Sequence, residues 1–414
     1  MAAFVLPHAD RSVPRAATKA GDFSRDRRGR VRAMPPILHY GFRPFFFLAA
    51  LHAGLAIPLW LWAYLGGIQI GGPFGGMHWH AHEMLFGYLG AVIAGFILTA
   101  IPNWTGRLPI SGMPLLTLVG LWSAGRAACL LSPDPWLAMV VDLAFPTVLA
   151  AAIWREVVAG RNWKNAPVAV MISLFGVASA TDHPANIGII DHALGQRLAL
   201  AVAAMLIALI GGRIVPSFTR NWLVKEGSSS LPKPFGVIDK AALATTVVAV
   251  LSWLAFPEAA FVGIAMCGAG ILLAIRLIGW RGVATLSEPI LLILHVGYGW
   301  LAVSLVLLGL AILVPAVPGS AALHALTAGA IGTMTLAVMT RASLGHTGRA
   351  IVADRPVIAA YLLVSGGAVL RVAAPFADQW YAAMIGLGGM LWSGGFLLFA
   401  IRYAPVLWGR RAAR

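Results

Sequence analysis

Long apolar stretches, separated by short polar segments, run through the chain from Phe45 to the C-terminal region. Each stretch holds about twenty residues with few charges, enough for a helix to cross a hydrocarbon core roughly 30 Å thick. We predict twelve spans, at residues 44–66, 80–102, 112–132, 135–156, 166–182, 191–216, 237–256, 258–279, 285–313, 319–342, 354–374 and 377–404. Backbone amides in lipid must be satisfied within each segment, so the predicted fold class is an all-α, polytopic membrane bundle.

The composition agrees with a membrane protein, because 59% of the 414 residues are hydrophobic and only 11% are charged. Residues 1–35 are basic and lack an apolar run, and we predict a disordered cytoplasmic tail. Residues 36–414 are predicted to form a single transmembrane domain. Within it, a cytoplasmic loop at residues 217–240 joins two halves of six helices each.

A net charge of +15 is compatible with nucleic-acid binding, but the distribution of the charge argues against it. Lysines and arginines concentrate in the tail and in every second loop, as the positive-inside rule describes, and the loops between carry almost none. Arg371, at the end of the eleventh span, is the exception. This pattern predicts both termini in the cytoplasm, with the lipid bilayer and not a nucleic acid as the partner.

Histidines gather toward the predicted outer side of the membrane. Three of them stand in the stretch HWHAHE at the mouth of the second span, one lies in the first turns of the tenth span, and one lies near the middle of the ninth. Ionisable groups within a membrane are costly, so they indicate a functional site. Imidazole is also the commonest metal ligand. The candidate metal ligands are His78, His80, His82, His295 and His324.

Helical spacing separates the three clustered histidines. His78 and His82 are four residues apart and share one face of a helix, whereas His80 points about 200° away. All three converge only if the span begins with non-helical backbone. Two metals, or one metal with a supporting partner, remain equally reasonable. Histidines in outer loops are more often surface residues, so His183 and His192 are not assigned as ligands.

The donor types narrow the choice of metal. Imidazoles without thiolates or a carboxylate-rich cage suit haem iron, copper or zinc, and not calcium or magnesium. Cys129 and Cys267 fall in separate predicted spans, and we assign them no role.

Two acidic residues are candidates for proton transfer. Glu83 adjoins the clustered histidines, and Glu288 lies two turns before His295 on the ninth span. A cap of the helix that begins near Pro289 is an equal alternative for Glu288.

Two arginines within the predicted spans are candidates for pairing with a buried negative charge. Arg126 and Arg197 are each predicted either to form a neutral buried pair with Asp142 or Asp182, or to neutralise a haem propionate.

Four motifs resemble the NnrS family, and together they extend over nearly the whole chain after the tail. They are FRPFFFLAALHAG, HWHAHEMLFGYLGAVIAGFILTAIPNWTGR, GGRIVPSFTRNW and HALTAGAIGTMTLAVMTRASLGHTGR. The resemblance implies a bacterial inner-membrane protein with about twelve spans that contains haem and copper and acts in nitric oxide metabolism. We expect the haem to be b-type, with His82, His324, Arg126 and Arg197 around it. The family's recurrent histidines correspond to His78, His80, His82, His295, His324 and His346.

The expected function is reduction of nitric oxide to nitrous oxide at a periplasm-side metal centre, with protection against nitrosative stress. Coupling two nitric oxide molecules needs two electrons and two protons, and a second metal beside haem iron would hold both substrates close together. A quinol or a periplasmic carrier would supply the electrons. The alternative is a protein that only binds nitric oxide or buffers haem or copper. Transport fits less well, because the histidines gather at one side of the membrane.

Overall fold

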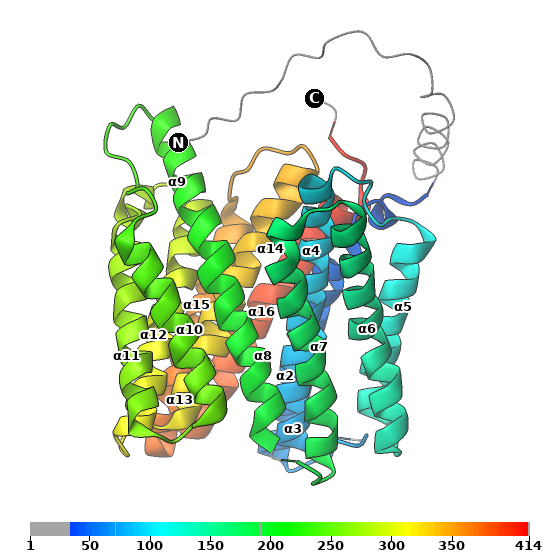
Figure 1. Cartoon of the computed structure of the whole chain (residues 1–414). Helices are drawn as coiled ribbons and strands as arrows, with labels where there is room; N and C mark the ends of the chain where they lie inside the picture. The colour runs from blue at the N-terminus through cyan, green and yellow to red at the C-terminus, as the bar shows by residue number, and fades with distance from the viewer. Residues whose placement is uncertain (1–33, 71, 191, 413–414) are drawn as a thin grey trace.

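A computed structural model describes residues 34–412, apart from residues 71 and 191, and the predicted tail lies outside the described residues except at its last two positions. The described part contains helices and no strand (Figure 1). Twelve helical segments within it are long and apolar enough to cross a membrane. The predicted all-α, twelve-span membrane bundle is therefore confirmed.

Nine of the spans are single α-helices, and three are interrupted by a π-helical segment. The single helices are α2 (Phe42–Gly66), α5 (Met113–Leu131), α6 (Pro135–Ala159), α7 (Ala166–Asn186), α10 (Val237–Ala255), α11 (Ala260–Ile278), α12 (Pro289–Leu313), α15 (Arg355–Ala373) and α16 (Tyr381–Trp408). The interrupted spans are α3 (Gly76–His82), η2 (Glu83–Leu89) and α4 (Gly90–Thr105); α8 (His192–Leu206), η4 (Ile207–Gly211) and α9 (Gly212–Lys225); and α13 (Gly319–His324), η6 (Ala325–Ile331) and α14 (Gly332–His346).

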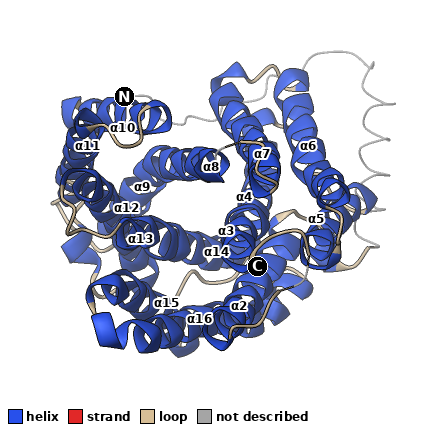
Figure 2. Cartoon of the chain, turned by 90° about the horizontal axis from the view of Figure 1, so that it is seen from below, coloured by secondary structure: helices blue, strands red, loops and turns tan. Residues whose placement is uncertain are grey.

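The spans are arranged as three arcs of four, seen end-on in Figure 2. One arc runs from α15 through α16 and α2 to the span of α4, the second runs from α5 through α6 and α7 to α8, and the third runs from α10 through α11 and α12 to the span of η6. The last span of each arc lies at the centre of the bundle. Among these inner spans, α8 contacts both η2 of the second span and η6 of the tenth.

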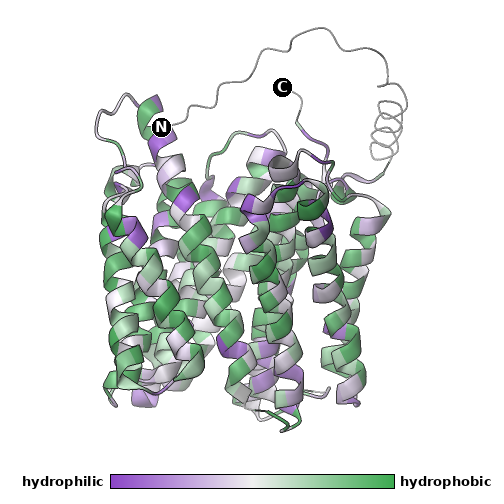
Figure 3. Cartoon of the chain, in the orientation of Figure 1, coloured by the Kyte–Doolittle hydropathy of each residue, from purple (hydrophilic) through white to green (hydrophobic). Residues whose placement is uncertain are grey.

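Burial identifies the three inner spans as the core of the bundle. In their most apolar windows, 83%, 61% and 72% of residues are buried in the second, sixth and tenth spans, against 56% or less in the others. Each inner span carries one π-helical segment, a feature that often marks functional sites in membrane and soluble helices. Apolar residues dominate the outer faces, and polar residues lie among the spans near the α3 end (Figure 3).

The described chain begins and ends at the same end of the bundle. The Arg43 guanidinium at the start of α2 donates to the carbonyls of Leu407 and Gly409, at 2.8 and 2.7 Å. This agrees with an even number of crossings, while the side of the membrane stays a prediction. We call this the terminal end, and the opposite end, where α3 and α13 begin, the histidine end.

One predicted boundary is wrong. The sixth span continues as α9 to Lys225, so the predicted loop at residues 217–240 begins only after the helix ends. The reason is that α9 becomes polar while it remains helical, so apolar length alone ended the predicted span too early. Figure 1 shows α9 rising above its neighbours. The division into two six-helix halves stays a prediction.

Candidate functional site: a buried histidine, cysteine and carboxylate network

The second span is helical from Gly76, so the three clustered histidines do not converge. His78 and His82 share one face of α3 and both reach Asp182 on α7. His82 Nδ1 lies 2.7 Å from Asp182 Oδ2, and His78 Nε2 lies 3.2 Å from Oδ1. His80 points away and stacks on Trp60 of α2, with ring centroids 4.2 Å apart. Of the arrangements left open by the sequence, a metal ligand with a supporting partner fits this geometry best.

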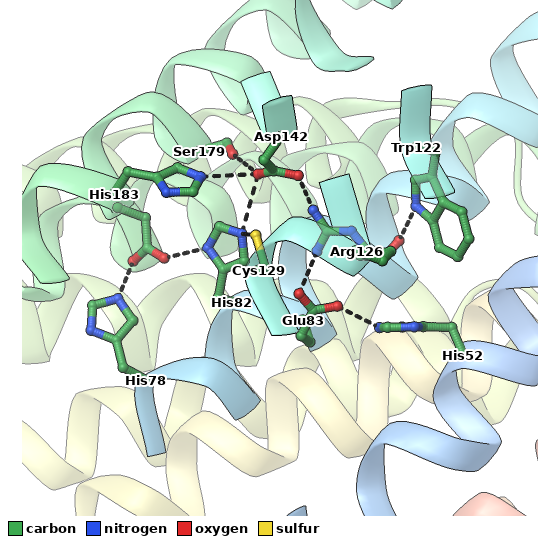
Figure 4. Close-up of polar contacts among 12 residues, drawn as sticks. His52, His78, His82, Glu83, Trp122, Arg126, Cys129, Asp142, Ser179 and His183 are labelled. Carbon is green, nitrogen blue, oxygen red and sulfur yellow. Dashed lines mark hydrogen bonds and ion pairs between the residues drawn. The ribbon is translucent and has the colours of Figure 1, made fainter. Parts of the chain in front are cut away.

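Four buried side chains converge beside His82. The imidazole Nε2 atoms of His82 and His183 lie 3.2 and 3.0 Å from Asp142 Oδ2, and Cys129 Sγ lies 3.7 Å from His82 Nε2 (Figure 4). One donor atom from each of these residues lies within 4.8 Å of the other three. The Ser179 hydroxyl also donates to Asp142 Oδ2, at 3.4 Å. We call His82, Cys129, Asp142 and His183 the quartet.

A buried arginine ties the quartet to Glu83. Arg126 on α5 forms an ion pair with Asp142 Oδ1 through one nitrogen and donates to Glu83 Oε1 through the other, at 2.8 Å. His52 Nε2 on α2 lies 2.9 Å from Glu83 Oε2. The predicted pairing of Asp142 with Arg126 is thus confirmed. The Arg126 guanidinium forms ion pairs with two carboxylates of the protein, those of Asp142 and Glu83.

The network has an excess of negative charge. Glu83, Asp142 and Asp182 are buried carboxylates, and Arg126 is the guanidinium that faces two of them. Counted with ionised carboxylates and neutral imidazoles, the difference is two negative charges, which two protons within the network or one divalent cation would neutralise. Unbalanced charge in the interior is strongly unfavourable, so the network requires one or the other.

The short loop before α3 closes the network toward the histidine end. Phe74 is 3% exposed and stacks on His82, with centroids 4.5 Å apart, and also contacts the rings of His78 and His183. Gly72 allows this path, because its φ is +89° and a Cβ there would meet the Cys129 carbonyl oxygen at 2.5 Å. Water is therefore kept away from the donors by an aromatic cover.

The helix around Glu83 also needs a glycine. A Cβ on Gly87 would lie 2.8 Å from His52 Nε2 and 3.0 Å from both Arg126 Nη1 and Glu83 Oε2. The carbonyl of Gly87 accepts from Trp122 Nε1 at 3.0 Å. The π-helical turn that starts at Glu83 thus places the backbone of Gly87, which has no side chain, against the Arg126–Glu83 ion pair.

The quartet offers two imidazole nitrogens, a sulfur and a carboxylate oxygen. This set suits zinc or copper, and it does not suit calcium or magnesium. His82 also has the outer partner typical of metal-bound histidines, because its second nitrogen faces a carboxylate. The residues present therefore fit a transition-metal ion.

The other predicted site residues lie elsewhere. His324 is not a member of the quartet, and its Nδ1 lies 2.7 Å from the Ser320 carbonyl oxygen of its own helix. His295 bonds to Thr219 of α9, with Nε2 and Oγ1 2.8 Å apart, two turns from the terminal end of α12. A role for His295 in metal binding, and one for Arg197 on α8, stay predictions.

Glu288 precedes α12 at the terminal end, where Arg341 acts on it electrostatically. Burial raises the pKa of its carboxyl, an effect that Arg341 opposes. His346, also at that end, packs against the ring of Phe42, with centroids 5.6 Å apart. Both residues are therefore separated from the quartet by the depth of the bundle.

Three members of the quartet were not predicted as metal ligands, and Asp142 was expected only to pair with an arginine. Cys129 was given no role and His183 was not assigned as a ligand, yet both lie in the quartet. A usable signal was present: Asp182 and His183 are adjacent at the outer end of one span, while Arg126 and Cys129 lie one turn apart on another. Only their packing against α3 makes them neighbours.

A comparison with protein-family models matches residues 36–411 to the NnrS protein family. A comparison with curated proteins finds no match. Because the family match extends over nearly all of the chain, the protein belongs to the NnrS family.

Proposed function

We propose that this chain is a metal-dependent membrane protein that reduces nitric oxide to nitrous oxide, with a copper ion held by the quartet. Membership of the NnrS family suggests a role in the response to nitric oxide. The observation that carries the proposal is the quartet itself: four buried donors within 4.8 Å of one another, in a network with two surplus negative charges.

Copper is preferred to zinc because of the reaction. Both ions accept histidine and cysteine ligands, but zinc has no redox chemistry, and the reduction of nitric oxide consumes electrons. A copper ion at this position would supply one-electron chemistry. The balanced reaction joins two nitric oxide molecules with two electrons and two protons to give nitrous oxide and water.

The protein would contribute orientation, proton supply and exclusion of water. Asp182 orients the His82 ring, and Arg126 holds both Asp142 and Glu83 in place. The buried Glu83 carboxylate and the half-buried His52 imidazole form a pair that can hold a proton beside the quartet.

The charge pattern supports a periplasmic location for the site. The positive-inside rule assigns the terminal end to the cytoplasm, so the histidine end would face the periplasm of a bacterial inner membrane. Nitric oxide is small and apolar and can reach such a site through lipid. Removing it there would protect the cell against nitrosative stress.

The test is anaerobic turnover of the purified, reduced protein with nitric oxide. The proposal predicts nitrous oxide production by the unaltered chain, loss of production in Cys129→Ala and His183→Ala, and retention in His346→Ala. Residue 346 is a suitable control because it contacts Phe42 at the opposite end of the bundle. A spectral change with nitric oxide but no nitrous oxide would replace catalysis by binding or metal buffering.

A further inference from the structure

A cavity lies beside the quartet, between the second span, α6 and α7. The centre of a water-sized sphere can occupy about 20 Å³ of it, which is room for one small molecule. Its lining residues are buried, apart from Pro146, which is half-buried. Protein interiors are densely packed and voids of this size are few, so one that is kept next to the quartet indicates a function.

The lining follows the three helices for about two turns. It is drawn from residues 142–149 of α6, 172–179 of α7 and 86–93 of the second span, and seven residues of an α-helix rise about 10 Å. The second span and α6 begin at the histidine end, and α7 ends there. Asp142 and Ser179 therefore lie at the end of the cavity nearer the histidine end, and the rest of the cavity extends toward the middle of the bundle.

Apolar side chains form most of the wall. Three are aromatic and three are aliphatic: Phe86, Phe145, Phe175, Ile93, Leu149 and Ile172. The two polar side chains are already bonded, because Ser179 donates to Asp142 Oδ2, which also faces His82 and His183 (Figure 4). A buried water needs about two to four polar partners, and this wall offers fewer. The cavity therefore suits a small apolar molecule better than a water molecule or a hydrated anion.

Two residues connect the cavity with the quartet. Asp142 belongs to both. Phe86 lines the cavity and packs against the ring of His82, with centroids 5.0 Å apart, and against the ring of Phe175, with centroids 5.4 Å apart. A molecule in the cavity would thus be one side chain away from a ligand of the proposed metal.

We propose that this cavity binds an uncharged gas molecule of diatomic size and passes it from the lipid to the quartet. Pro146 marks the point of entry, since Thr147 and Val148 after it are exposed on the outside of the bundle. Proline cannot donate the helical hydrogen bond to the preceding turn, so α6 is easier to bend here. Identifying the gas as nitric oxide rests on the proposed function, whereas the pocket itself does not.

Gly90 offers a way to fill the cavity without touching the quartet. It lines the cavity, and the contact of its added Cβ among the described residues would be with Phe175 Cε1 at 3.8 Å, an ordinary distance. Gly90→Val should therefore place its methyl groups in the cavity. Gly268→Val on α11 is the matched control, because no described atom lies within 4 Å of its added carbon.

The test of the pocket is xenon binding, because xenon is uncharged and apolar, fills dry cavities and needs no metal. Crystals of the purified chain under xenon pressure should show anomalous scattering from one atom in the cavity. Gly90→Val should lose this atom and Gly268→Val should keep it. Phe175→Leu enlarges the cavity and should raise the occupancy, which keeps the test decisive if Gly90→Val does not fold. An ordered water or lipid chain in place of xenon, or equal occupancy in the unaltered chain, Gly90→Val and Phe175→Leu, would overturn the pocket.

The route to the quartet is tested by the rate at which nitric oxide binds to the metal-loaded chain, followed by stopped-flow spectroscopy. Gly90→Val should slow this association and Gly268→Val should not, with equal metal content in both. Equal rates, or no binding of nitric oxide at all, would overturn the route. Xenon in the cavity without nitrous oxide production would reject the proposed catalysis and leave the pocket in place.

Discussion

The ring of His82 is held between two carboxylates, with Asp182 Oδ2 2.7 Å from Nδ1 and Asp142 Oδ2 3.2 Å from Nε2. The shorter contact orients the ring from α7, and the longer one points the other nitrogen into the quartet. This relationship distinguishes a supporting carboxylate, Asp182, from a ligating one, Asp142.

Asp182→Asn should weaken metal binding without abolishing it. The amide keeps the shape of the side chain but loses the charge that orients and polarises His82, and such outer partners typically change affinity by about 10–100-fold. Competition against a chelator would measure the effect. Asp354→Asn, which alters an exposed ion pair with Arg402, is the matched control. Equal affinities in both variants would remove Asp182 from this role.

Arg126→Met should destabilise the folded protein by about 3–5 kcal/mol, because it leaves Glu83 and Asp142 buried without their cation. Unfolding in detergent, followed by a spectroscopic probe, would measure the loss. Arg402→Met breaks an exposed pair with Asp354 and should cost at most about 1 kcal/mol. Similar losses in the two variants would show that the Arg126 ion pairs are not a special source of stability.

Gly87→Ala should disturb the same network sterically. The added methyl group would lie within 3.0 Å of side-chain atoms of His52, Arg126 and Glu83, so at least one of these must move. We expect reduced stability and weaker metal binding. Gly120→Ala on α5 is the control, because no atom lies within 4 Å of its added carbon. A fully stable, metal-replete Gly87→Ala protein would contradict the close packing described here.

The fold could be predicted from the sequence because each span is a local property. Twenty apolar residues must form a helix in lipid, whichever neighbours they have, so each span can be recognised on its own. The boundary at α9 was misjudged for the same reason, since a helix can continue after its apolar residues end.

The site could be predicted only in part. The three histidines around Trp79 are close in sequence, so their importance was visible, and helical spacing separated His80 from His78 and His82. Cys129 and His183 come from two other spans, and the local signal for them was an ionisable neighbour on the same span, Arg126 for Cys129 and Asp182 for His183. Their approach to His82 depends on how α5 and α7 pack against the second span, which is a long-range property.

X-ray absorption at the metal edge, after metal quantification, tests the central claim most directly. We predict one copper per chain with two imidazole ligands and one sulfur ligand, and loss of the sulfur signal or of the metal in Cys129→Ser. A metal-replete protein without a sulfur ligand, unchanged in both Cys129→Ser and His183→Ala, would contradict it.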